Sequence, residues 1–322
     1  MDHTLTDAAG RARAPSSTAT VLLTGATGFV GHELLGHLRS SPLRCLVRDA
    51  SRLLRDDEDD TGPEAIEADL SEIESLRPAL EGIEEVFYLV HSMEPGSEGF
   101  ADRDRRAATN YAEVAASCGV RRTIYLGGIA AGDKGSEHLE SRHEVEEVLA
   151  AATPEFVGLR ASMIVGARSG SFRALVQLVD RLPVLALPSW RESRTQPIAI
   201  GDVVECLLAA RQTEPGVYDV AGPDVLSFEE MTEVVSELLG QRHRSVSIPF
   251  SNAPAEAALA AVVTDEDRAL LEPLMAGLHS DLLVDENAAS SVFGIEPTPF
   301  REAAAGAIEG MRRARADGAL VD

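Results

Sequence analysis

The chain has 322 residues, enough for one large α/β domain or for such a domain with a smaller partner. Its 53 acidic and 29 basic residues give a formal net charge of −24 at pH 7. A field of that sign repels nucleic acids and anionic membrane surfaces, and no apolar run approaches the ~20 residues that span a bilayer. An acidic excess is typical of proteins that work in concentrated salt, which predicts a halophilic acidic surface.

Residues 1–19 are mostly small and polar, and they lack the apolar core of a secretory signal. We therefore predict a disordered tail over residues 1–19 and a cytoplasmic protein. Of the three cysteines, Cys45 and Cys206 lie in apolar segments, which favours buried thiols over a disulfide or a metal site.

A glycine-rich turn follows this tail. The apolar run 21–23 leads into three glycines spaced G-x-x-G-x-x-G, and an amphipathic helix begins near Phe29. Gly25 allows the tight turn, Gly28 lets the backbone approach a diphosphate, and Gly31 lets the helix pack on the strand. The helix start directs its free N–H groups and its positive dipole end at the anion. The predicted dinucleotide contacts of this turn are Gly25, Thr27, Gly28, Phe29, Val30 and Gly31.

Strands and helices alternate over the first two-thirds of the chain. This alternation predicts parallel strands joined by right-handed crossovers, that is, an α/β fold with a doubly wound, mostly parallel Rossmann sheet. We assign residues 20–160 to this dinucleotide-binding core. The alternation weakens after Ala161, which predicts a smaller, mainly helical C-terminal lobe over residues 161–322, interleaved with the end of the sheet.

Ligands of such sheets bind outside the carboxyl ends of the strands. Arg48 directly follows the second strand, and no acid stands at the last apolar position of that strand. An arginine there accommodates a 2′-phosphate, which favours NADP(H) over NAD(H), unless Arg48 and Asp49 form an ordinary surface pair. Asp69, beside the predicted contact Leu70 at the next strand end, either accepts a hydrogen bond from the adenine amine or caps the helix near Ser71.

Several motifs along the chain point to one family. They are Thr24–Gly31, Ala68–Leu70, Leu89–Met93, Tyr125–Gly128, Leu159–Ala161, Gln196–Val203 and Tyr218–Gly222. With them, residues 20–310 resemble the atypical and extended short-chain dehydrogenase/reductase superfamily. The resemblance is closest to its NAD(P)H-binding branch, which includes NmrA-like regulators, YbjT-like proteins and the 39-kDa accessory subunit of respiratory complex I.

The usual reductases of that superfamily use Ser, Tyr and Lys, with the last two spaced Y-x-x-x-K. None of the four tyrosines here has a lysine four residues later, the usual serine position falls near Gly128, and the matching helical pair is His138 and Arg142. In one interpretation His138 donates the proton and Arg142 holds the nicotinamide ribose. In the other, His138 is an ordinary helix-start residue and Arg142 pairs with Glu146 on the surface.

His91 and Ser92 follow the fourth strand, on the expected nicotinamide side. Together with Val90 they are predicted cofactor contacts, and His91 is a second candidate proton donor. Alternatively, His91 only satisfies a backbone group of its loop.

Three further residues have structural as well as functional interpretations. Asn110, inside a helix, is expected to tie a strand backbone. Arg160 closes a buried strand and needs an acidic partner such as Asp202, or a bound ligand. Trp190, the only tryptophan, either walls a substrate pocket or packs the lobe.

Two functions are compatible with these residues. The first is an NADP(H)-dependent reductase of a small carbonyl or quinone-like substrate that works without the standard triad. The alternative is a non-catalytic NAD(P)-binding regulator or assembly and accessory protein. We expect a small-molecule substrate of unknown identity, no metal, no nucleic acid and no membrane span, and helices of this branch allow a homodimer.

Overall fold

The computed structural model describes the glycine turn, most of the sheet and its helices, and the main elements of the lobe. The described residues are 5–6, 12–13, 20–38, 41–53, 62–91, 99–129, 137–182, 184–187, 189–241, 244–247, 258, 260–266, 271, 275 and 280–316. No helix within these ranges is both long enough and apolar enough to cross a bilayer.

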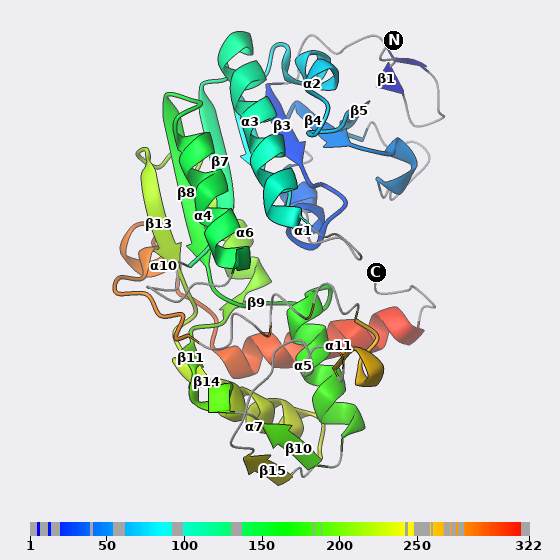
Figure 1. Ribbon diagram of the computed structural model, residues 1–322, viewed down its shortest axis with the longest axis vertical. Helices are drawn as coiled ribbons and strands as arrows, with labels where there is room; N and C mark the ends of the chain where they lie inside the picture. The colour runs from blue at the N-terminus through cyan, green and yellow to red at the C-terminus, as the bar shows by residue number, and fades with distance from the viewer. Residues whose placement is uncertain are drawn as a thin grey trace.

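A nine-stranded sheet in the order β13-β8-β7-β6-β3-β4-β5-β1-β2 forms the upper half of the molecule (Figure 1). Its parallel strands are β3 (Val21–Thr24), β4 (Leu43–Val47), β5 (Glu64–Glu67), β6 (Glu85–Tyr88), β7 (Arg122–Gly128), β8 (Glu155–Ala161) and β13 (Gly216–Val220). Two short strands, β1 (Leu5–Thr6) and β2 (Ala12–Arg13), add antiparallel pairs at the β5 edge, within the predicted tail. The chain runs from β3 outward to β5 and returns to β6 on the other side of β3. This reversal confirms the doubly wound prediction and places the switch point beside β3.

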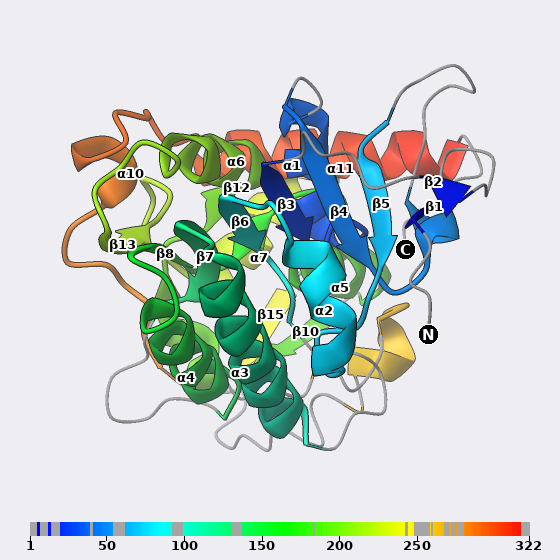
Figure 2. The same cartoon turned by 90° about the horizontal axis from the view of Figure 1, so that it is seen from above.

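Helices cover both faces of the sheet (Figure 2). One face carries α1 (Phe29–Leu38) and α6 (Ile200–Ala209), and the other carries α2 (Ile73–Leu80), α3 (Phe100–Cys118) and α4 (Glu137–Ala150). Neighbouring residues of β3 enter different cores, since Leu23 packs under α1 while Leu22 packs under α2 and α3. A strand that is buried on both faces has apolar residues at successive positions, which explains the apolar run in β3.

The lobe lies below the sheet and packs around a third apolar core. Its main helices are α5 (Gly170–Arg181), α7 (Phe228–Leu238) and α11 (Phe300–Ala316). The described residues beyond β8 also form three two-stranded sheets. These pair β9 (Ile164–Val165) with β12 (Ile198–Ala199), β10 (Val184–Leu187) with β15 (Arg244–Ser247), and β11 (Arg194–Thr195) with β14 (Leu226–Ser227). The short helices are η1 (Ala50–Arg52), η2 (Ser189–Glu192) and α10 (Ala288–Ser291). Both α6 and β13 come from beyond residue 161, and β13 pairs with β8 at the edge of the sheet.

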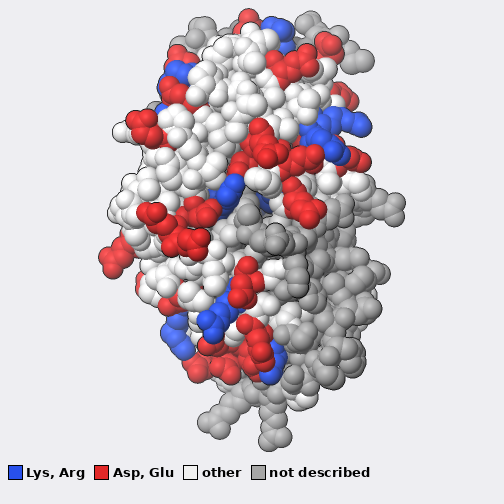
Figure 3. Space-filling view, turned by 60° about the vertical axis from the view of Figure 1, so that its left-hand side comes forward, with Lys and Arg blue, Asp and Glu red and all other residues white. Residues whose placement is uncertain are grey.

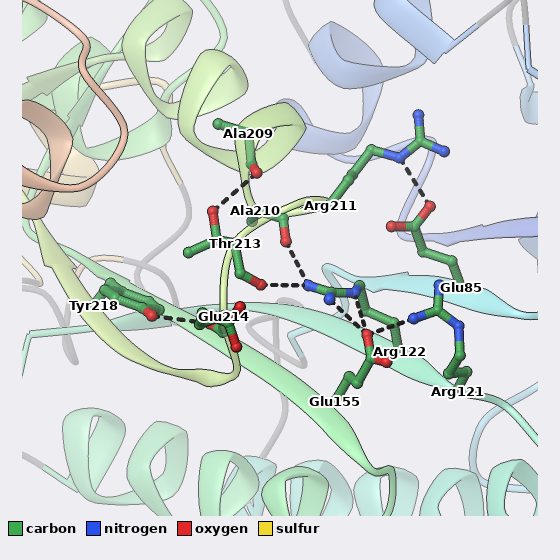
Figure 4. A network of polar contacts seen from close by, with 10 residues as sticks. All are labelled: Glu85, Arg121, Arg122, Glu155, Ala209, Ala210, Arg211, Thr213, Glu214 and Tyr218. Carbon is green, nitrogen blue, oxygen red and sulfur yellow. Dashed lines mark hydrogen bonds and ion pairs between the residues drawn. The ribbon is translucent and has the colours of Figure 1, made fainter.

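A polar network fastens the amino ends of the strands (Figure 4). The Arg122 guanidinium donates to the carbonyl oxygens of Ala210 and Thr213 at 2.9 and 2.8 Å, and its Nε donates to Glu155 at 3.0 Å. Arg211 donates to Glu85 of β6 at 2.8 Å. These contacts tie the start of three strands to the end of α6, so this edge is structural and the opposite, carboxyl edge is the place for a ligand.

The cysteine prediction is confirmed for both apolar segments. Cys45 and Cys206 are buried free thiols, and burial raises the pKa of each to about 12. Such thiols stay protonated and take part in packing.

Candidate functional site

The glycine turn leaves no room for a side chain at two of its positions. Gly25 has φ +73°, and a Cβ there would lie 2.8 Å from the Leu89 carbonyl oxygen. A Cβ on Gly31 would lie 2.0 Å from the Gly25 carbonyl oxygen, while Gly28 closes the turn by donating its N–H to that same oxygen at 2.9 Å. This close approach holds the start of α1, whose first N–H groups have no partner within the helix, at the carboxyl edge of β3. The cradle therefore fits the diphosphate of a dinucleotide.

A cavity of about 560 Å³ opens beside this turn, between the carboxyl ends of the strands and the lobe. On the sheet side it is lined by Gly25, Gly28, Phe29, Val30, Gly31, Leu89, His91, Gly128 and Arg142. On the lobe side it is lined by residues of α5 and α7 and by residues near 193–195 and 271–282. The structure thus brings seven of the predicted site residues to one cavity: Gly25, Gly28, Phe29, Val30, Gly31, His91 and Arg142.

His91 follows β6 and is held by a carboxylate from α3. Its Nδ1 lies 2.7 Å from Asp104 Oδ2, and the two side chains are 17% and 4% exposed. An ionised carboxylate only accepts hydrogen bonds, so Nδ1 carries the proton and Nε2 is the nitrogen that gains or loses one. Burial lowers the pKa of His91 and the charge of Arg142 lowers it further, whereas Asp104 opposes both. The hydrogen bond with Asp104 shows that His91 does more than satisfy a backbone group of its loop.

Asp104 is a site residue that the sequence analysis missed. It falls on the buried stripe of α3 together with Ala107, Ala108 and Tyr111, at helical spacing. An acid at a core position of an amphipathic helix is the signal that marks it, because a buried carboxylate requires a partner.

Arg142 projects from α4 toward the end of β7. It donates a hydrogen bond to the Leu126 carbonyl oxygen, and its guanidinium lies 5.9 Å from the centre of the Tyr125 ring. Its Nε is buried, and no acceptor among the described residues contacts it. A cationic donor of this kind, on the wall of a cavity, fits an incoming hydroxyl or phosphate oxygen.

The predicted surface pair of Arg142 with Glu146 is wrong. Glu146 is buried, and it accepts hydrogen bonds from Arg160, with 2.8 Å between Arg160 Nε and Glu146 Oε2. Asp202 is likewise not the partner of Arg160, because it accepts hydrogen bonds from Thr298 N at 2.7 Å and Thr298 Oγ1 at 3.0 Å. Both acids satisfy structural partners that lie far away in the sequence.

At the usual serine position, Gly128 packs closely against α4. A Cβ on Gly128 would lie 3.1 Å from Leu139 and 3.6 Å from Arg142, so α4 sits close against this glycine. The side chain of His138 lies outside the described residues, as does Ser92.

The predicted adenosine contacts lie at the strand ends but outside the cavity lining. Arg48 is exposed after β4. Asp49 accepts hydrogen bonds from Ser51 N at 2.9 Å and Ser51 Oγ at 2.6 Å, so its described hydrogen bonds serve the start of η1. Asp69 Oδ1 accepts from Ser71 N at 2.7 Å in the turn before α2, while the N-cap position of α2 is Glu72.

Three remaining predictions concern residues around this edge. The Leu70 carbonyl oxygen accepts a hydrogen bond from Asn110 Nδ2 at 2.9 Å, so Asn110 ties a backbone group, in the turn after β5 and not in a strand as predicted. Thr27 and Val90 are partly buried, and neither lines the cavity. Trp190 is buried in the lobe, edge-on to Phe228 with ring centres 4.9 Å apart, so it packs behind a wall residue.

No group of three His, Cys, Asp or Glu side chains in the described part of the chain converges as metal ligands would. In the described residues the site thus combines a glycine cradle, the His91–Asp104 pair, Arg142 and Arg194.

Comparison with known proteins agrees with this geometry. Residues 25–164 match the NAD(P)H-binding family model. Over 266 residues the chain is 26% identical to the mitochondrial NADH dehydrogenase [ubiquinone] 1 alpha subcomplex subunit 9 of Arabidopsis thaliana, a match covering 77% of this chain and 64% of that protein. Over 234 residues it is 29% identical to (4-alkanoyl-5-oxo-2,5-dihydrofuran-3-yl)methyl phosphate reductase of Streptomyces griseus, covering 69% and 74% of the two chains.

The fold also has solved counterparts. An NADPH-dependent quinone oxidoreductase of Escherichia coli, solved with NADPH, superposes with a TM-score of 0.68 at 19% identity, covering 88% of this chain and 98% of that one. The family match over residues 25–164, the glycine cradle and the switch point beside β3 support the resemblance of this chain to the NAD(P)H-binding branch of the atypical short-chain dehydrogenase/reductase superfamily.

Proposed function

We propose that this protein is an NADPH-dependent reductase of a carbonyl or quinone-like substrate, in which His91 takes the place of the missing tyrosine. The observation that carries the proposal is the 2.7 Å contact between His91 and Asp104 on the wall of the cavity beside the glycine turn. A histidine oriented by a buried carboxylate is an arrangement that enzymes use to move protons.

The residues present fit the cofactor. The start of α1 would hold the diphosphate, Arg142 would hold an oxygen of the nicotinamide ribose, and the exposed Arg48 would face the 2′-phosphate. NADPH, when bound, supplies a hydride for the carbonyl carbon.

The protein itself supplies the proton. His91 in its imidazolium form gives the Nε2 proton to the carbonyl oxygen, and the neutral ring then regains a proton from solvent. Asp104 keeps the ring oriented and stabilises its charged form. Because the pKa of His91 is lowered, carbonyl reduction should become faster as the pH falls toward that pKa.

The relatives support this assignment in two ways. The Streptomyces griseus relative is named as a reductase, and the Escherichia coli structure is of an NADPH-dependent enzyme with NADPH bound. The first favours reduction for the present chain, and the second favours NADP(H).

The second candidate function is that of an accessory or regulatory protein that binds the cofactor without turnover. Two observations favour it: Gly128 replaces the serine of the standard triad, and the plant relative is named as a subunit of a larger dehydrogenase. The same experiment separates the two functions.

That experiment is a titration of the purified protein in high salt with NADPH, NADP⁺, NADH and NAD⁺, following bound-nicotinamide fluorescence, and then a panel of quinones and aldehydes. We expect NADPH to bind and be oxidised. We expect His91→Ala to lower turnover by about 100-fold or more, the range for removing a general acid. His37→Ala, an exposed histidine of α1, is the matched control and should retain activity. Loss in His138→Ala instead of His91→Ala would move the proton donor to α4. Tight NADPH binding without turnover of any compound would favour the accessory role.

A further inference from the structure

Besides the glycine turn, the cavity is lined by helices of the lobe. We call the apolar part of this lobe-side wall the apolar arm. This apolar arm is formed by Ala174, Leu175, Leu178, Phe228, Met231 and Leu271.

The arm is built by regular helix faces. Ser171, Ala174, Leu175 and Leu178 recur at intervals of three and four residues, so one stripe of α5 faces the cavity from its start inward. Phe228 is the first residue of α7. Along this stripe of α5 the hydroxyl group of Ser171 comes first and is followed by hydrocarbon side chains only.

The lining carries no negative charge. The chain has 53 acidic residues, and Figure 3 shows acidic side chains spread over one face of the molecule. None of the described residues that line the cavity is Asp or Glu, and its ionisable groups are His91, Arg142 and Arg194. A cationic ligand would find no counter-charge here, whereas an uncharged chain loses nothing on entering the arm.

An apolar space of this size beside a cofactor site needs an occupant. Protein cores pack to the density of organic crystals, and unfilled apolar volume lowers stability. The arm remains open although flexible side chains such as Met231 stand beside it and could fill it by a change of rotamer. Ligand sites are typically of this kind, apolar with a few polar groups that fix orientation.

We infer that the apolar arm takes the linear alkyl chain of an amphipathic substrate whose carbonyl group lies beside His91. The inference names the substrate class for the proposed reductase and rests on that function for the position of the carbonyl. The arm and its ligand chemistry are tested by binding alone.

Trp190 provides the readout. It is the only tryptophan, and its ring packs edge-on against Phe228, which lines the arm. A chain that enters the arm changes the surroundings of Phe228 and hence the emission of Trp190. The probes are the straight-chain 2-alkanones from 2-butanone to 2-dodecanone, titrated into the full-length protein with and without NADPH.

We expect saturable changes in Trp190 emission and a Kd that falls about fourfold for each added methylene, until the arm is full and the Kd levels off. Ala174→Phe fills the arm and should abolish the dependence on chain length while leaving the Kd for NADPH unchanged. Ala305→Phe, the same substitution at an exposed position of α11, is the matched control and should behave as the wild type. If Ala174→Phe does not give a cooperative thermal transition, Leu178→Phe takes its place.

The outcomes separate the two proposals. A Kd that does not change with chain length, or one that changes equally in Ala174→Phe and Ala305→Phe, overturns the apolar arm. Chain-dependent binding without NADPH oxidation supports the arm and counts against the reductase. Oxidation of NADPH by short ketones with no gain from longer chains supports the reductase and counts against the arm.

Discussion

Replacing Gly31 with alanine adds one methyl group at the tightest point of the glycine cradle. The new Cβ would lie 2.0 Å from the carbonyl oxygen and 2.7 Å from the carbonyl carbon of Gly25. Both atoms belong to the backbone, so the overlap is relieved only if α1 moves away from the turn. That movement withdraws the N–H groups that would receive the diphosphate.

The matched control is Gly36 in the same helix. Gly36 is exposed, and a Cβ at this position would have no heavy atom within 4 Å. Both substitutions gain the same helix propensity, about 1 kcal/mol. The difference between them therefore isolates the close approach, which we expect to cost about 1–3 kcal/mol, the usual range for overpacking. If all of it appears in cofactor binding, the Kd for NADPH rises roughly 5- to 150-fold.

Two measurements show how this cost is divided between folding stability and cofactor binding. They are urea unfolding of the free protein and titration with NADPH followed by nicotinamide fluorescence. We expect Gly36→Ala to be slightly more stable than the wild type and to bind NADPH equally well. Gly31→Ala should lose stability, affinity or both. Equal behaviour of the two variants in both assays would refute the close approach as the basis of the cradle.

Other residues give further predictions. Asp104→Asn removes the carboxylate that raises the pKa of His91, so the loss of activity with rising pH should begin at a lower pH than in the wild type. Turnover at pH 7 should fall about tenfold or more, with the Kd for NADPH nearly unchanged. An unaltered pH profile would show that Asp104 is only structural. Arg48→Ala should weaken NADPH binding by about tenfold or more without affecting NADH, as expected for a lost hydrogen bond to a charged group, whereas Arg312→Ala on α11 should affect neither. Raising KCl from about 0.1 to 1 M shortens the Debye length from about 10 to 3 Å, so the Tm of this chain with net charge −24 should rise, and a Tm that falls would contradict a salt-adapted surface.

The parts of the fold that could be predicted from the sequence depend on local spacing. The close approach of Gly31 to Gly25 lies within seven residues, and the alternation of strands and helices fixes the crossovers. Asn110 could be interpreted because a polar side chain on a buried helix face must reach a backbone group.

The parts that could not be predicted depend on pairs that are distant along the chain. Glu146 lies four residues after Arg142, which suggests an ion pair within α4, yet the tertiary fold brings Arg160 of β8 to Glu146 instead. The wall of the cavity likewise combines α5, α7 and Leu271, segments whose apolar residues look like ordinary core. No spacing rule shows which apolar residues face an opening and which face each other.

In the proposed reductase, the distribution of charge around the cavity explains why Asp104 would act through His91. An acid on the cavity wall would repel the phosphates of a dinucleotide, and the described lining contains none. Asp104 instead lies behind the histidine ring, 2.7 Å from Nδ1 and 4% exposed. From there its charge favours the imidazolium that gives up a proton, while the ring separates it from the ligand. Burial and Arg142 act against that charge and lower the pKa of His91, so in the proposed reaction the imidazolium would give up its proton readily to the carbonyl oxygen. Without the carboxylate, burial and Arg142 would lower the pKa of His91 still further, so in the proposed reductase the pair of His91 and Asp104, rather than His91 alone, would take the place of tyrosine and lysine.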